Sequence, residues 1–323
     1  MSTESAPDTE LVPVTVKTIE RTGEGTVHYA HIQAEGAKTG QAAMVLPGYG
    51  MGIASATPLG RAIARPDGAT TTRETLIMEH SRTEFNLTLA QLKGLYKDAS
   101  PSAWRLPLAV LIRAHEAVVV LREQGRAAHL IGHSLGGMTA VGVALLDRSL
   151  VSSITLFNSG GLMRPGLSQV PRLLGRFIKN WTYEMFGDPR APRTPEQKKL
   201  MMSTVWQTFF GYIFKGLSVT APLKALKEEV AVAMTDIKPL LDELESQGIQ
   251  ITLMYDELDR VFPPSKVEEH MNMTLGTLET HKGPRRIVQT YDNLHYGPVV
   301  NPRAFGKIAQ DAMQSAEKAT NDA

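Results

Sequence analysis

The sequence predicts an α/β fold built on a mainly parallel, eight-stranded sheet that is flanked by helices, with a helical cap inserted after the sixth strand. Two observations predict it. Short β-rich runs recur along the chain, mostly as continuous apolar stretches, and helical patterns separate the later runs. Continuous apolar runs are typical of strands buried on both faces. Strands that alternate with helices predict parallel pairing through right-handed crossovers.

The eight β-rich runs define the expected strands. They cover Val14–Ile19, Val27–Ala34, Ala42–Leu46, Thr75–Met78, Ala128–Ile131, Ser153–Phe157, Ile249–Tyr255 and Arg286–Tyr291. Helical patterns follow several of the later runs, and the first of them ends at Gly125 as a C-terminal cap. These helices are expected at Leu106–Gln124, Leu135–Leu146 and Pro302–Ser315.

One long segment, residues 161–245, interrupts this alternation because it contains helical patterns and no convincing strand. The patterns cover Pro171–Met185, Pro195–Phe214 and Pro222–Met234. We interpret the segment as an inserted helical cap, or lid. The core domain then consists of residues 12–160 and 246–323, and the polar residues 1–11 form a disordered tail.

Aromatic side chains gather in the same insertion. The chain has 20 aromatic residues in all, from 9 Phe, 8 Tyr and 3 Trp, and the insertion holds many of the bulkiest. Such rings either pack a cap onto a core or line a lipophilic pocket. We expect Trp181, Phe209 and Phe210 to contact a substrate.

The charge balance excludes some classes of partner. The chain has 34 Lys and Arg against 33 Asp and Glu, a formal net charge of +1, which provides no field to attract nucleic acid or an acidic membrane. A small, apolar molecule is the expected partner. The absence of cysteine excludes disulfides, thiolate metal sites and a cysteine nucleophile, so any nucleophile is an oxygen or a lysine.

The amino-terminal residues are polar and acidic and do not resemble a secretory signal, so we expect a cytoplasmic protein. No run of about 18 apolar residues occurs. The most apolar helical pattern, near Leu106–Leu121, is interrupted by Arg113, His115 and Glu116. A membrane span is therefore not expected.

The strongest chemical motif is Gly132-His133-Ser134-Leu135-Gly136, which follows an expected strand and precedes an expected helix. A serine nucleophile on such a sharp turn needs very small residues two positions before and after it, and the glycines meet this need. The helix that begins here directs its first N–H groups toward the serine. We therefore predict Ser134 as nucleophile and the Leu135 amide as an oxyanion donor. A serine helix cap in a Gly-rich turn is the structural alternative.

A second oxyanion donor is expected from the Gly-rich stretch Met44–Gly52, where the third strand ends. Its glycines allow an amide to turn inward, and we assign the amide of Tyr49. Phosphate binding is the alternative for such a loop, but neither a following Lys-Ser/Thr pair nor dinucleotide-binding spacing is present.

A serine nucleophile also needs a base, and the base needs an acid that fixes its tautomer. In this kind of fold the acid and the histidine both follow the serine. Asp259 lies four residues after the seventh strand, in a loop ended by two prolines, and Asp256 is its competitor. His295 follows the last strand and is the predicted base. His133 is next to the serine, but neighbouring side chains at such a turn point apart, so we interpret it as a packing residue.

With these motifs placed, the chain resembles the α/β-hydrolase fold superfamily over roughly residues 25–315, especially its capped, esterase-like members with a Gly-His-Ser-Leu-Gly-Gly turn. The resemblance implies Ser134, Asp259 and His295 as catalytic triad, the Tyr49 and Leu135 amides as oxyanion hole, and a mechanism without cofactor or metal. Two positions depart from the family pattern. Pro47 stands where histidine is common, and Asp256 stands where glycine is often found, which keeps Asp256 open as the acid.

The reaction expected from this resemblance is hydrolysis of a carboxylic ester with a lipophilic acyl group through an acyl-enzyme. Thioester hydrolysis and C–C bond hydrolysis use the same triad and stay open. A non-catalytic ligand-binding protein of the same fold is the alternative from another class. Basic residues at the cap would favour a coenzyme A thioester, but we interpret those present as a solvated surface cluster. They are Lys198, Lys199, Arg190 and Arg193.

Overall fold

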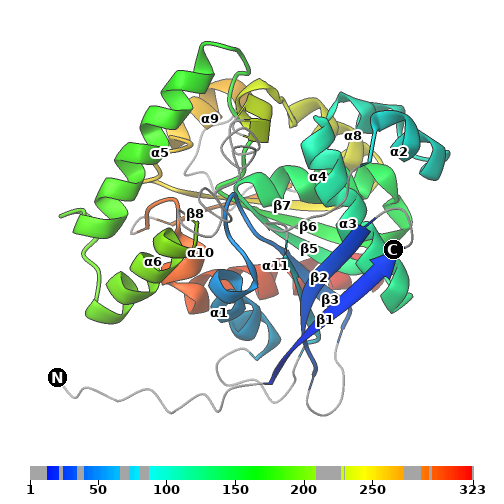
Figure 1. Ribbon diagram of the computed structural model, residues 1–323, viewed down its shortest axis with the longest axis horizontal. Coiled ribbons are helices and arrows are strands. Elements are labelled where there is room, and N and C mark those ends of the chain that lie inside the picture. The colour runs from blue at the N-terminus through cyan, green and yellow to red at the C-terminus, as the bar shows by residue number, and fades with distance from the viewer. Residues whose placement is uncertain are drawn as a thin grey trace.

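The computed structural model describes residues 13–21, 25–34, 40–65, 73–79, 87–208, 227–228, 230–272, 285–290 and 293–321. The predicted amino-terminal tail, residues 1–11, lies outside these ranges. Within them, an eight-stranded sheet runs through the middle of the molecule and helices pack on both of its faces (Figure 1). This arrangement confirms the predicted α/β class.

The strand order across the sheet is β1-β2-β4-β3-β5-β6-β7-β8, and β2 alone runs opposite to its neighbours. The sheet is therefore mainly parallel, as predicted. The strand bounds are β1 Val14–Arg21, β2 Gly25–Ile32, β3 Ala42–Leu46, β4 Thr75–Glu79, β5 Ala128–His133, β6 Val151–Phe157, β7 Gln250–Asp256 and β8 Arg285–Thr290.

Two layers of helices cover the two faces of the sheet. α3 (Leu108–Gln124), α4 (Leu135–Leu146) and α8 (Lys238–Ser246) lie on one face, where the larger apolar core forms. α1 (Ile53–Ala64) and α11 (Pro302–Asn321) lie on the other face and pack a second core against the strands. Central strands buried on both sides explain why β3 and β5 read as continuous apolar runs.

Most helix boundaries follow local signals in the sequence. α3 begins two residues later than predicted, because Pro107 is its N-cap, and it ends at Gly125, whose φ is 64°. The short helix α2 (Leu89–Leu95) begins after Thr88, which forms a capping box with Gln91. α11 extends beyond the predicted end, Ser315, to Asn321. Two short 3-10 helices cover Pro101–Arg105 and Arg148–Leu150.

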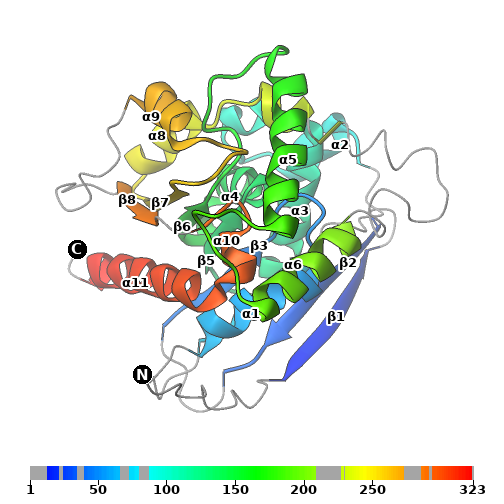
Figure 2. The same cartoon turned by 90° about the vertical axis from the view of Figure 1, so that its left-hand side faces the viewer.

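The segment between β6 and β7 carries helices joined by turns and loops in its described residues. It contains α5 (Gln169–Phe186), α6 (Pro195–Thr208), a helical stretch at 230–234, and α8. α5 and α6 stand over one end of the sheet, in front of α10 (Gly297–Val300) (Figure 2). α8 differs from the others because its buried residues Leu240, Leu241 and Leu244 belong to the main core. The predicted cap boundary at residue 245 therefore includes a helix that packs as part of the core.

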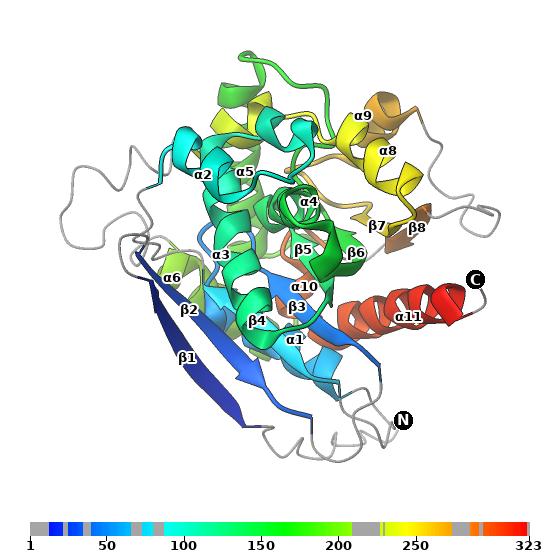
Figure 3. The same ribbon diagram turned by 90° about the vertical axis from the view of Figure 1, so that its right-hand side faces the viewer.

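The carboxyl-terminal part returns to the sheet. α9 (Pro264–Met271) follows β7, and α10 leads into α11, which crosses the face opposite α4 (Figure 3). In the part of the chain that the structure describes, no helix combines the length and the apolar character needed to cross a membrane.

Candidate active site

The turn between β5 and α4 presents Ser134. β5 ends at His133 and α4 begins at Leu135, so the serine occupies the single residue between strand and helix. Its backbone angles are φ 55° and ψ −121°, a conformation that non-glycine residues rarely adopt. The strain is held by hydrogen bonds from Ser134 N to Phe157 O and from Gly160 N to Ser134 O, both of 3.0 Å. Such strain is typical of functional turns.

Contacts with neighbouring backbone explain the glycines of this turn. A Cβ at Gly132 would lie 2.5 Å from the carbonyl oxygen of Gly136, and a Cβ at Gly136 would lie 1.9 Å from that of Leu46. A Cβ at Gly48 would lie 3.0 Å from Ser134 Cβ. Backbone atoms cannot move aside as flexible side chains can, so these positions exclude any larger residue.

Ser134, His295 and Asp259 form one chain of hydrogen bonds. Ser134 Oγ lies 3.0 Å from His295 Nε2, and His295 Nδ1 lies 2.8 Å from Asp259 Oδ2. The other oxygen of Asp259 accepts hydrogen bonds from the amides of Val261, at 2.7 Å, and Phe262, at 3.0 Å. Because Asp259 accepts from Nδ1, the hydrogen of the neutral ring is placed there and Nε2 is left to accept the serine hydroxyl.

Asp256, the competing acid, takes a different position. It is the last residue of β7, and its carboxylate accepts a hydrogen bond of 2.8 Å from Asn158 Nδ2. Burial, opposed by that hydrogen bond, raises the pKa of Asp256 well above its usual range, and the nearby Asp259 adds to the rise. The carboxylate that meets the imidazole of His295 is that of Asp259.

The backbone of His295 is held as firmly as its ring. Its carbonyl oxygen accepts hydrogen bonds from His133 Nε2, at 2.8 Å, and from Asn158 Nδ2, at 3.4 Å. Burial, together with the nearby His295, lowers the pKa of His133 to about 3, so this ring is neutral and donates from Nε2. His133 thus packs against the serine turn, as predicted, and also positions the histidine loop.

The two predicted oxyanion donors, Leu135 and Tyr49, belong to the segments that adjoin the serine turn. Leu135 is the first residue of α4, and N–H groups in the first turn of a helix have no partner within the helix. Tyr49 follows Gly48, where an added Cβ would lie 3.0 Å from Ser134 Cβ, and the ring of Tyr49 lies 6.2 Å from that of Phe177.

The helix α5 packs against the histidine. The ring of Phe177 lies 5.9 Å from that of His295, and the indole N–H of Trp181 donates a hydrogen bond of 2.9 Å to Tyr296 Oη. Trp181 therefore contacts Tyr296, the residue that follows His295. The other two predicted substrate contacts, Phe209 and Phe210, lie outside the described residues.

Sequence reasoning missed Glu184, which also reaches the histidine loop from α5. Its carboxylate accepts a hydrogen bond of 3.2 Å from Tyr296 N and forms an ion pair with Arg193. Both side chains are buried, with 3% of Arg193 exposed, so the predicted surface cluster is wrong for Arg193. The available signal was the spacing of Phe177, Trp181 and Glu184, which places them on one face of a helix.

The chemistry of this site is acid–base and nucleophilic. Among the described residues, no group of three histidine or acidic side chains is arranged to hold a metal ion. What the structure brings together is a strained serine at a helix start, a histidine within hydrogen-bond reach and a buried carboxylate behind it. These parts allow proton transfer coupled to nucleophilic attack.

The fold and this site define a class of enzymes, the hydrolases with a mainly parallel sheet and a nucleophile at a strand-to-helix turn. The profile of the alpha/beta hydrolase family matches residues 26–298. The chain belongs to this family. No curated protein sequence matches the chain.

Solved structures share the fold at low sequence identity. A hydrolase of 2-hydroxy-6-oxo-6-phenylhexa-2,4-dienoate from Rhodococcus sp. strain RHA1 is 16% identical, with a TM-score of 0.60 over 93% of this chain and 100% of that one. A malate-bound thermophilic esterase from Thermogutta terrifontis is 12% identical, with a TM-score of 0.58 over 94% and 99%. A bromoperoxidase from Bacillus anthracis is 10% identical, with a TM-score of 0.58 over 93% and 100%. Because these proteins differ in activity, the likeness shows the fold alone.

Proposed function

We propose that this protein is a serine hydrolase that cleaves a carboxylic ester with a lipophilic acyl group. The observation that carries the proposal is the hydrogen-bonded chain from Ser134 through His295 to Asp259, with the serine on a strained turn. Membership of a hydrolase family supports it. The roles below follow from the distances and from the charge that each step develops.

In the first step, Ser134 Oγ attacks the acyl carbonyl carbon while its proton passes to His295 Nε2, 3.0 Å away. Asp259 stabilises the imidazolium that forms. The carbonyl oxygen becomes an oxyanion, which the amides of Leu135 and Tyr49 stabilise. Collapse of this intermediate breaks the C–O bond, and His295 returns the proton to the leaving alcohol. Water, deprotonated by His295, then releases the acid and regenerates the serine.

The lipophilic character of the substrate rests on the rings that surround the triad. Phe177 and Phe262 lie 5.9 and 5.3 Å from the ring of His295, and Tyr49 contacts Phe177. Such a wall excludes water from the acyl-enzyme, which strengthens the electrostatic interactions within the site. We further propose that α5 and α6 act as a cap over the acyl group.

The direct test is hydrolysis of p-nitrophenyl esters of increasing acyl length by the wild type and by Ser134→Ala. Intact mass after reaction with an alkyl phosphonate probe reports whether the serine is acylated. We expect turnover and labelling in the wild type, and a loss of both in Ser134→Ala of at least about 10³-fold.

The other outcomes separate the alternatives. Labelling of Ser134 without ester turnover would favour a thioester or a C–C bond as the target, because both reactions use the same nucleophile. A wild type that is neither labelled nor active would contradict the proposal and favour a ligand-binding protein.

A further inference from the structure

A cleft of about 290 Å³ opens between the start of the cap segment and α9. One wall comes from the chain after β6 and the first two turns of α5, and the other from α9. The lining side chains are mainly charged. They include Arg164, Arg172, Arg176, Lys266, Glu269 and His270.

Positive charge is concentrated in this cleft although the whole chain is nearly neutral. Lys266 pairs with Glu269 at 2.6 Å, and His270 lies 3.0 Å from Asp236. Among the described residues, no carboxylate forms a salt bridge with the three arginines, although Glu269 lies near Arg164. The arginines therefore leave the cleft with an excess of guanidinium groups, which bind carboxylate and phosphate in a bidentate manner.

Arg176 is the innermost of these cations. It is half-buried, and it donates a hydrogen bond of 3.5 Å to the sulfur of Met163, a weak acceptor. Burial and the neighbouring Arg172 lower the pKa of Arg176, whereas Asp259 opposes this. A half-buried guanidinium beside another cation gains most from an anion that enters the cleft.

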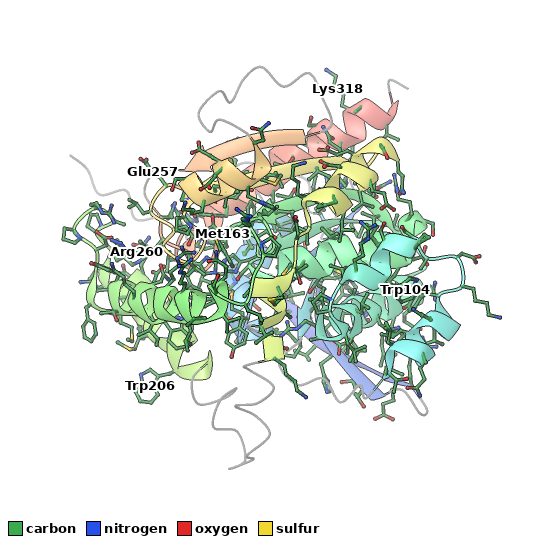
Figure 4. All side chains as sticks on the ribbon, turned by 90° about the horizontal axis from the view of Figure 1, so that it is seen from above. Trp104, Met163, Trp206, Glu257, Arg260 and Lys318 are labelled. Atoms are coloured by element: carbon green, nitrogen blue, oxygen red, sulfur yellow. The ribbon has the colours of Figure 1, made fainter. Side chains whose placement is uncertain are left out.

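Both walls of the cleft are connected through short stretches of chain to residues that contact the proposed triad. Gly160 N donates a hydrogen bond of 3.0 Å to Ser134 O, and Met163, which lines the cleft, follows three residues later. Three residues of chain span at most about 10 Å. On the other side, Arg176 immediately precedes Phe177, whose ring packs on His295. Figure 4, the view from above, shows Met163 toward the middle of the molecule with Arg260 on its left.

We propose that this cleft binds an anionic group of the substrate, a carboxylate or a phosphate, and so holds the acyl carbonyl at Ser134. The inference rests on the proposed function and adds a substrate class to it. The substrate is an ester whose apolar part contacts the rings around His295 and whose charged end lies between α5 and α9. Arg172 and Arg176 bind that end.

The test uses two matched series of p-nitrophenyl esters. One series consists of half-esters of linear dicarboxylic acids of increasing length, and the other has acyl chains of the same length that end in a methyl group. We expect the wild type to prefer a charged ester in kcat/KM by about tenfold or more, with an optimum in chain length. Arg172→Gln should reduce this preference about tenfold. The exposed Lys179, two turns further along α5 and outside the cleft, provides the control Lys179→Gln, which should keep it.

A second measurement does not depend on turnover. Binding of glutarate and of inorganic phosphate to Ser134→Ala, followed by calorimetry, should weaken when Arg172→Gln is added, and the tighter of the two anions identifies the carboxylate or the phosphate as the ligand. Hydrolysis of neutral esters without any preference for charged ones, and without anion binding, would overturn this proposal and leave the proposed function intact. Anion binding that depends on Arg172 in a protein without hydrolase activity would overturn the proposed function and support the anion site.

Discussion

In the part of the chain that the structure describes, two Ser–His–carboxylate chains of hydrogen bonds occur, one at each end of the sheet. At the carboxyl ends of the strands, Ser134 meets His295 and Asp259. At the amino ends, Ser153 Oγ lies 2.7 Å from His129 Nδ1, and His129 Nε2 lies 3.1 Å from Glu317. Both serines and both histidines are buried. In both chains of hydrogen bonds a histidine bridges a serine and a carboxylate, but the ring nitrogens are exchanged, because Ser134 meets Nε2 and Ser153 meets Nδ1.

They differ in the backbone that carries the serine. Ser153 lies within β6 opposite His129, next to a shift in the pairing register of the two strands, but its φ is not positive. Ser134 lies at a strained turn before a helix, where the amides of Leu135 and Tyr49 are the proposed oxyanion donors. Glu317 also differs from Asp259, because it pairs with Arg73 at 2.6 Å. Ser134 is therefore distinguished from Ser153 by its strained turn at the start of a helix, because both serines have a hydrogen-bonded histidine and carboxylate.

The largest difference in activity is expected between two single variants, in which either His295 or His129 is replaced by glutamine. His295→Gln removes the proposed base and should lower kcat/KM for a p-nitrophenyl ester by at least about 10³-fold. His129→Gln should cost about 1–3 kcal/mol of stability and leave the kcat/KM of the folded enzyme within about threefold. Steady-state kinetics on both variants, with circular dichroism to measure the folded fraction, makes the comparison. Equal losses of kcat/KM in the two variants would contradict the assigned roles.

The next effect concerns the stability of the serine turn. Gly136→Ala places a Cβ 1.9 Å from Leu46 O, so the strand or the helix must move, at a cost of about 3 kcal/mol or more. Urea unfolding monitored by tryptophan fluorescence measures the change. Gly175→Ala, in α5 with open space around it, is the matched control and should raise stability by up to about 1 kcal/mol. A tolerated Gly136→Ala would show that the backbone contact does not fix the turn.

A smaller effect, on stability, is expected when the pH is lowered and Glu317, at the amino ends of the strands, takes up a proton. Burial alone would raise the pKa of Glu317, but hydrogen bonds from His129 and Arg73 outweigh it and lower this pKa well below the usual range. The folded protein therefore takes up this proton at lower pH than the unfolded chain, whose glutamate titrates near about 4.3. The stability that Glu317 contributes is complete above that pH and is lost as the pH falls below it.

Glu317→Gln tests this account through urea unfolding at several pH values. At pH 7 the free energy of unfolding of the variant should be roughly 2 kcal/mol lower than that of the wild type, because Arg73 loses its charged partner. Near pH 3 the two free energies should be closer to each other. A difference between the two proteins that does not change between pH 7 and pH 3 would contradict the pKa shift of Glu317.

The serine turn could be predicted from the sequence because its causes are local. Gly132 and Gly136 are required by backbone contacts within the turn and with the adjacent strand, and a strand and a helix flank them. The alternating strands and helices likewise predicted the sheet, because burial on both faces leaves continuous apolar runs. The order of serine, acid and histidine along the chain then placed Asp259 and His295.

The features that the sequence did not predict depend on contacts between segments that are distant along the chain. Asp256 and Asp259 are three residues apart, and the choice between them is made by the turn in which Asp259 N bonds to Asp256 O, at 3.0 Å. That turn leaves Asp256 against Asn158 and directs Asp259 to His295. Glu184 accepts a hydrogen bond from the amide of Tyr296, which lies 112 residues further along the chain. The charged cleft combines α5 with α9, so composition alone, with a net charge of +1, gave no sign of it.

The central claim is that His295, oriented by Asp259, activates Ser134. The most direct measurement is the rate at which an alkyl phosphonate labels Ser134, followed by intact mass in the wild type, Asp259→Asn and Asp256→Asn. Asp259→Asn should slow labelling by about 10³-fold or more, because the amide leaves His295 in the wrong tautomer, whereas Asp256→Asn should stay within about tenfold of the wild type. Slower labelling in Asp256→Asn than in Asp259→Asn would contradict this claim.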